Sequence, residues 1–92
     1  MEALDEKKII AELAREGFSD IRVVPLPPHE DLPAHRHDLH TVHVILEGGL
    51  IVTDGKAMWI FHPGERVEFS AGTVHKARGM TEAGRMVVGI RK

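Results

Sequence analysis

Two spacings of apolar residues divide the chain into an N-terminal helix and a longer β region. Residues 3–16 carry apolar side chains at the spacing of one helix face, with charged residues on the other face. The apolar stripe consists of Ile9, Ile10, Leu13 and Ala14. Gly17 is a plausible end for the helix. So short a helix gains little stability alone, so we expect its stripe to dock as a lid over a sheet or against a second subunit.

From residue 20 onward the pattern becomes strand-like, with apolar residues in alternation or in short runs. Pro25-Leu26-Pro27-Pro28 ends the first strand and predicts an edge position or a rigid connection there. Asp54-Gly55 is a hairpin signal, and Pro63-Gly64 is a turn. The expected strands cover residues 21–24, 42–46, 50–53, 57–61, 67–69, 73–77 and 85–90. Short strands with frequent turns predict an antiparallel barrel or sandwich.

Composition narrows the class of protein. A chain of 92 residues predicts one domain, with the helix at about 3–16 and the barrel at about 20–91. The formal charge of −2 and the absence of a basic block argue against a nucleic-acid partner. No apolar run approaches a membrane span, and the charged N-terminus does not resemble a secretory signal. We therefore expect a cytoplasmic protein with no membrane partner.

The most unusual stretch is residues 33–43, where four of eleven residues are histidine. His35 and His37 are two positions apart, so on an extended strand both imidazoles point to one face. His75 lies far along the chain, behind the turn signal at 70–73. Neutral imidazole is a common metal ligand. A fold that brings His75 beside the pair would create a three-histidine metal site.

Two motifs, one around the His35–His37 pair and one around His75, resemble those of the cupin superfamily. The first family motif is a glycine, five residues, H-x-H, three or four residues, a glutamate, six residues and a glycine. His35-x-His37 and Gly48 match it, whereas His29 stands at the opening glycine and Thr41 at the glutamate. The second family motif is a glycine, five residues, P-x-G, two residues, a histidine, three residues and an asparagine.

Three residues match this second motif: Gly64, Gly72 and His75. Ser70 stands at its proline and Gly79 at its asparagine. The resemblance implies a small single-domain cupin. Its expected fold is all-β, an antiparallel jelly-roll barrel with a short N-terminal helix. It also implies one divalent metal, commonly iron, manganese, nickel, copper or zinc, with His35, His37 and His75 as ligands.

The usual glutamate ligand is missing, because Thr41 is a poor metal ligand. His43 shares strand parity with Thr41, so it faces inward if Thr41 does. It is therefore a candidate fourth ligand, or a residue of the pocket. His40 would face outward if the strand has already begun, although a bulge at residues 38–39 would turn it inward. Water is the remaining candidate for the fourth position.

A metal-free interpretation is also open. The three histidines would then hydrogen-bond to one another, to Thr41 or to water. His29 and His62 are expected in solvated turns. Arg36 and Arg78 are candidate anion-binding groups. The residues that would line a substrate pocket, or simply form the core, are Met58, Trp59, Phe61, Phe69 and Met86; among these, Trp59 is the first choice for a ligand contact.

Three functions fit this sequence. The first is a metal-dependent enzyme on a small molecule, either a dioxygenase that cleaves a dicarbonyl or catechol-like substrate or an isomerase. The second is a non-catalytic module that binds or senses a small ligand or a metal. The third is a storage or structural barrel. Three neutral imidazoles leave a divalent ion with its full charge, which suits a Lewis acid with open positions.

The small core and open sheet edges predict a homodimer. The first strand and the helix are the expected contact elements.

Overall fold

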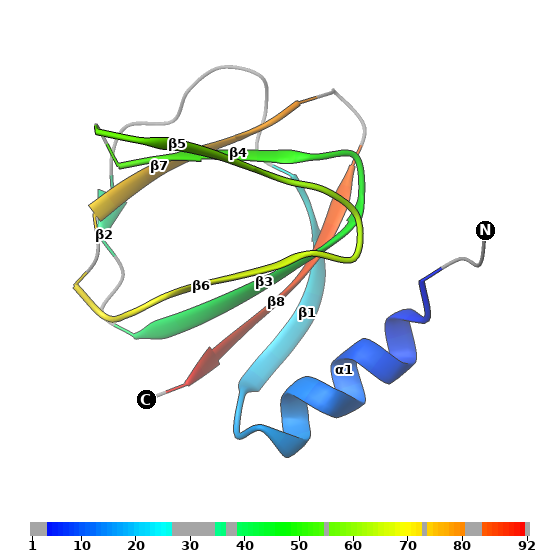
Figure 1. The fold of residues 1–92 in the computed structure, drawn as a ribbon. Coiled ribbons are helices and arrows are strands. Elements are labelled where there is room, and N and C mark those ends of the chain that lie inside the picture. The colour runs from blue at the N-terminus through cyan, green and yellow to red at the C-terminus, as the bar shows by residue number, and fades with distance from the viewer. Residues whose placement is uncertain are drawn as a thin grey trace.

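The computed structural model describes residues 4–26, 35–36, 39–54, 56–72, 74–80 and 84–91, with the backbone alone described at 35–36 and 74–75. This part of the chain forms one helix and two antiparallel sheets that face each other (Figure 1). The elements are α1 (Glu6–Arg15), β1 (Ser19–Pro25), β2 (His35–Arg36), β3 (His40–Glu47), β4 (Leu50–Thr53), β5 (Met58–Phe61), β6 (Arg66–Phe69), β7 (Val74–Gly79) and β8 (Arg85–Arg91).

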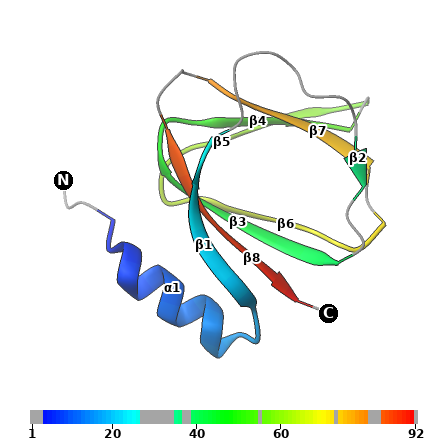
Figure 2. The ribbon, with the colours of Figure 1, turned by 180° about the vertical axis from the view of Figure 1, so that it is seen from behind.

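The strand order is β1-β8-β3-β6 in one sheet and β2-β7-β4-β5 in the other. The chain crosses between the sheets from β3 to β4 and from β5 to β6, as Figure 2 shows from behind. The predicted all-β antiparallel fold with a short N-terminal helix is confirmed. The first strand lies at the edge of its sheet, as its prolines indicated.

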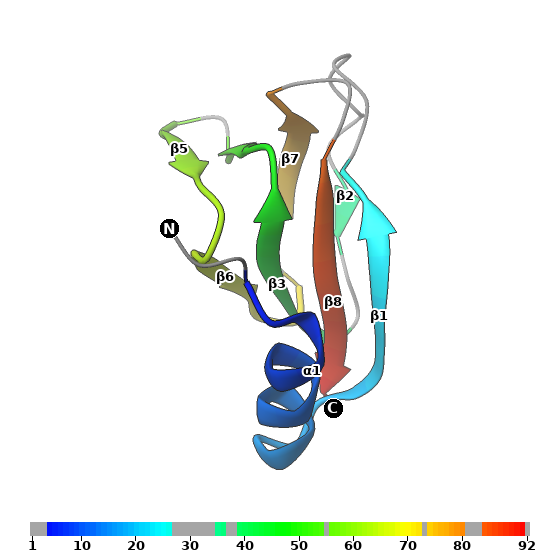
Figure 3. The same cartoon turned by 90° about the vertical axis from the view of Figure 1, so that its right-hand side faces the viewer.

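Helix α1 begins where Asp5 caps it, with the Asp5 carboxylate accepting a hydrogen bond from the Lys8 backbone N–H at 3.1 Å. It therefore starts three residues later than predicted. Gly17 follows it with a φ of 97°, a left-handed conformation that favours glycine. The helix lies outside the β1-β8-β3-β6 sheet, against β1 and β8 (Figure 3). Of the two alternatives for the helix, the structure shows the lid over a sheet.

The apolar core has two layers, because alternate residues of β3 point to opposite faces of its sheet. The outer layer lies under the helix and contains Leu13, Phe18, Val42, Val44, Leu46 and Val87. The inner layer lies between the two sheets and contains Leu26, Ile45, Leu50, Val52, Phe69 and Met86. A cavity adjoins the inner layer, because Val52 and Phe69 line it as well.

Two motif glycines sit where the backbone needs them. Gly48, between β3 and β4, has a φ of 81°, and Gly72, before β7, has a φ of 88°. Side chains with a Cβ rarely adopt this left-handed region. These glycines therefore help to set the turns that precede β4 and β7. No helix in the described residues is long and apolar enough to cross a membrane.

Candidate metal site and adjoining cavity

The histidines of β3 lie on opposite faces of the strand. His40 opens β3 and faces the helix side, where its ring centroid lies 5.9 Å from that of Phe18. Its Nε2 lies 2.7 Å from a carboxylate oxygen of Glu68. The strand has begun at this residue, and His40 shares the face of Val42 and Val44, which pack under the helix. His40 is therefore not a candidate for the fourth ligand.

Thr41 and His43 face the space between the sheets, as the strand parity predicted. Thr41 is directly opposite Phe69 of β6, and its exposed fraction is only 4%. The Nε2 of His43 lies 3.3 Å from the Thr41 hydroxyl, and its ring meets the Phe69 ring edge-on at a centroid distance of 5.5 Å. Thr41, which stands at the motif's glutamate position, thus contacts His43 of the same strand.

The pairing of β2 with β7 brings two distant parts of the chain together. His35 is directly opposite His75 in this antiparallel register. Directly opposed residues have Cα atoms about 4.5–5.5 Å apart. Position 75 precedes Ala77 by two residues, and Ala77 packs against the inner core layer. Ala77 therefore marks the inner face of β7, and the backbones of residues 35 and 75 are neighbours in the same sheet.

His37 lies outside the described residues, and so does His29. Within the described residues, no group of three histidine, cysteine, aspartate or glutamate side chains is placed to hold a metal ion. The ligand set His35, His37, His75 and His43 therefore stays a prediction. The backbones of His35 and His75 are opposite each other across β2 and β7, and His43 faces the space between the sheets.

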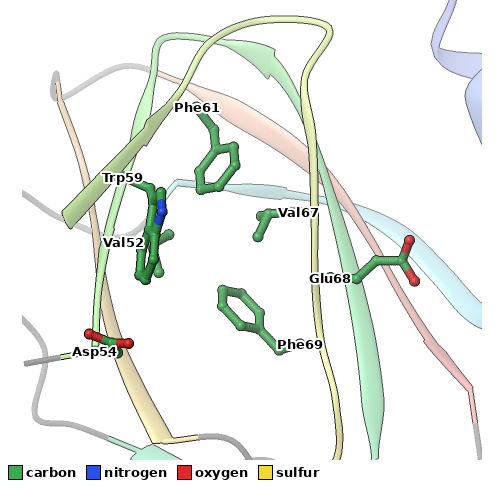
Figure 4. A pocket seen from close by; sticks show the side chains of 7 residues that line it. All are labelled: Val52, Asp54, Trp59, Phe61, Val67, Glu68 and Phe69. Carbon is green, nitrogen blue, oxygen red and sulfur yellow. The ribbon is translucent and has the colours of Figure 1, made fainter. Parts of the chain in front are cut away.

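A cavity of about 250 Å³ opens beside this interior, between the edge strands β5 and β6. Its lining residues are Val52, Asp54, Trp59, Phe61, Val67, Glu68 and Phe69. The rings of Trp59, Phe61 and Phe69 turn toward one space, whereas the Glu68 carboxylate points away from it (Figure 4). Of the residues expected in a pocket or in the core, these three aromatics line the cavity, and Phe69 also belongs to the inner core layer. Met58 is exposed and Met86 belongs to the core.

Asp54 places a carboxylate at the end of β4, on the rim of the cavity (Figure 4). Its Oδ1 accepts hydrogen bonds from the backbone N–H groups of Ala57 at 3.0 Å and Lys56 at 2.9 Å. These bonds lower the pKa of Asp54, so the group stays anionic. Sequence reasoning used this residue only as a turn signal. The parity of Leu50, Val52 and Asp54 was the available clue that it shares their inward face.

The outer face holds a separate charged cluster. Arg66 forms a two-pronged ion pair with Glu16 at 2.7 and 2.8 Å and also contacts Glu68. The hydrogen bond from His40 and the bonds from Arg66 lower the pKa of Glu68. His62 lies in an exposed turn beside Glu65, as predicted. These charges join the end of the helix to β6 and β3 and take no part in the interior.

Solved structures share this fold. A cupin-2 domain containing protein from Shewanella frigidimarina NCIMB 400 matches with a TM-score of 0.65 and 22% identity, over 77% of this chain and 69% of that chain. The DMSP lyase DddQ from Ruegeria pomeroyi DSS-3 matches with a TM-score of 0.67 and 25% identity, over 78% of this chain but 37% of the lyase. A predicted oxalate decarboxylase from Thermotoga maritima matches with a TM-score of 0.65 and 18% identity, over 87% and 71%.

A search of curated proteins finds no match to the chain. A family model described as "Cupin domain" matches residues 22–89, which run from within β1 to within β8 and include both histidine motifs. The matching range, the two facing antiparallel sheets and the similar solved structures agree with the resemblance seen in the sequence. This chain belongs to the cupin family.

Proposed function

We propose that this cupin binds one divalent transition metal, iron, manganese, nickel, copper or zinc, between its sheets and acts there on a small molecule. The proposed ligands are His35, His37 and His75, with His43 as the fourth imidazole. The observation that carries the proposal is the register of β2 and β7, which sets His35 opposite His75 although forty residues of sequence separate them.

The β3 strand supports His43 as the replacement for the missing carboxylate. The motif's glutamate position is occupied by Thr41, whose hydroxyl has no negative charge to offer a metal. His43 lies on the same inner face and contacts that hydroxyl through Nε2. A hydrogen bond of this kind orients an imidazole ring, as the outer partners of metal-bound histidines do.

A divalent ion held by neutral imidazoles would keep its full charge and would act as a Lewis acid. The described residues add the surroundings of that site. Phe69 packs on His43 and limits the positions of its ring. Val52, Val67 and Phe61 give the adjoining cavity apolar walls. If water and not His43 completes the metal's ligands, His43 is the candidate to move a proton, whereas His40 is engaged on the outer surface.

Two proteins of similar structure support an enzyme that acts on a small molecule, since one is a DMSP lyase and one a predicted oxalate decarboxylase. For this chain we propose a dioxygenase-like or isomerase-like reaction. The alternative is a non-catalytic module of the same fold that binds or senses a small ligand or the metal. The cavity beside His43 suits either function, so turnover must decide between them.

The remaining proposals concern the state of the protein. We propose that residues 1–92 form one domain and that the protein is a cytoplasmic homodimer without nucleic-acid or membrane partners. The edge position of β1 supports the dimer, because an edge strand offers backbone groups for pairing. Sedimentation equilibrium measures the number of chains directly.

Elemental analysis of protein purified without a histidine tag tests the metal site. We expect about one divalent ion per chain in the wild type and a loss of most of it in His75→Ala, because a ligand of the proposed set is removed. His62→Ala is the matched control, since His62 lies in an exposed turn. Equal metal content in His75→Ala and wild type would exclude this site.

Metal-loaded protein then separates the two functions. Oxygen consumption or conversion of a dicarbonyl substrate that disappears in His75→Ala supports the enzyme. A ligand that raises the melting temperature without being converted supports the binding module.

A further inference from the structure

The cavity between β5 and β6 combines a group of aromatic rings with a carboxylate at its rim. Three aromatic rings, those of Trp59, Phe61 and Phe69, turn toward one space (Figure 4). Asp54 adds an anionic carboxylate at the rim. We propose that this cavity binds a small organic cation, an alkylammonium or other onium group, with its alkyl groups against the rings and its charge toward Asp54.

Aromatic faces attract such cations because the ring quadrupole is negative above and below its plane. Tryptophan is the strongest of the aromatic side chains in this role. Trp59 keeps 45% of its surface exposed although it is the largest apolar residue of β5. A side chain that served only to fill the core would be covered. The exposed ring is therefore available to a ligand.

The charge pattern around the cavity favours a cation over an anion. Asp54 is held by two backbone hydrogen bonds that fix its orientation and its charge. The carboxylate of Glu68 points away from the cavity (Figure 4). On the outer face it pairs with the Arg66 guanidinium and lies 2.7 Å from His40 Nε2. The Lys56 ammonium also lowers the Asp54 pKa, although less than the backbone bonds do. A cationic ligand would compete with Lys56 for the same carboxylate.

The size of the cavity limits the ligand to a small group. Its volume of about 250 Å³ lies below the roughly 300–1,000 Å³ of clefts that enclose drug-sized ligands. The other walls are the aliphatic residues Val52 and Val67. Branched alkyl groups on a cationic centre fit such walls better than a strongly hydrated primary ammonium does.

The cavity ligand would be the substrate of the proposed function, and only this last step rests on that function. Binding itself requires no metal. It is therefore tested on metal-free protein, so that a failure of the cavity and a failure of the metal site are separate results.

The test compares choline with its uncharged isostere 3,3-dimethylbutan-1-ol and with the anionic 3,3-dimethylbutanoate. Trp59 is the single tryptophan of the chain, so its fluorescence reports on the cavity directly. We expect saturable choline binding at least about tenfold tighter than that of the alcohol, and no binding of the anion. Equal binding of choline and the alcohol, preference for the anion, or no binding of choline would each overturn the proposal.

Two substitutions separate the contributions of the ring and the carboxylate. Trp59→Leu, followed by calorimetry, should weaken choline binding about tenfold, because it keeps apolar bulk but removes the ring face. Asp54→Asn should weaken choline and not the alcohol, since an amide oxygen can still accept the two backbone bonds. Asp20→Asn is the control, because this exposed carboxylate lies on β1 of the other sheet. Unchanged choline binding in both cavity variants would also overturn the proposal.

Discussion

The two faces of β3 differ although they are built from neighbouring residues of one strand. On the outer face, Val42 and Val44 pack beneath Leu13 of the helix, and His40 is paired with Glu68. On the inner face, Thr41 and His43 border an interior that leads to an aromatic cavity. The outer face is closed by tertiary packing, whereas the inner face keeps polar groups and space for a ligand. The comparison shows that one strand can pack against a helix on one face and border a cavity with polar groups on the other.

The largest expected effect is the loss of the helix contact on the outer face. Leu13 is 1% exposed, so Leu13→Ala should lower the free energy of unfolding by about 2–5 kcal/mol through lost burial and a cavity. Urea unfolding followed by circular dichroism measures this change. Leu4→Ala is the control, because Leu4 is 41% exposed and its removal should cost less than about 1 kcal/mol. Similar losses in the two variants would contradict the closed outer face.

The next test compares the two histidines of β3. If His43 is the fourth ligand, His43→Ala should lower metal affinity at least about 10–100-fold, as changes at metal-supporting residues do. His40→Ala should leave metal affinity unchanged, since its Nε2 contacts Glu68 on the other face. Competition with a chelator of known affinity measures both variants. Equal effects would show that the faces do not differ in the way proposed.

The smallest effect concerns the outer charged cluster. Glu68→Gln should lower the free energy of unfolding at neutral pH by only about 0.2–1 kcal/mol, because Glu68 and its partner His40 are both partly exposed to solvent. The folded protein lowers the pKa of Glu68, so its stabilising contribution is complete above the usual value of 4.5 and is lost as the pH falls through the lowered pKa. The difference between wild type and Glu68→Gln should therefore disappear in acid.

Urea unfolding from neutral pH to well below 4.5 follows this dependence. Glu12→Gln, on the exposed side of the helix, provides the matched loss of one carboxylate. A difference between wild type and Glu68→Gln that grows in acid would contradict the assignment of the lowered pKa to the folded state.

Much of the fold could be predicted from local pattern. The strand Leu50–Thr53 has the predicted bounds, and the helix, the edge strand and the turns lie where apolar spacing, proline and glycine indicated. These features depend on residues that are close in sequence, because backbone sterics and side-chain periodicity act over a few positions. The helix start was placed too early, since the capping bond of Asp5 depends on a side-chain geometry that periodicity does not report.

The candidate site shows where the sequence reached its limit. The two motifs identified His35, His37 and His75, and strand parity placed His43 inward if Thr41 was inward. The face of His40 depended on where β3 begins, and only the pairing of His40 with Arg91 of β8 shows that the strand has started. Asp54 is a turn residue by sequence, and it borders a cavity only because β4, β5 and β6 meet there.

By itself, then, the sequence determined the order of elements, the cupin resemblance and the residue types offered to a metal. The tertiary structure decided which backbone positions oppose each other, as at His35 and His75, and which side of a strand is covered by the helix. The physical reason is that register and sheet packing are set by contacts between residues distant in sequence. Such contacts are fixed only when both sheets have buried their apolar faces.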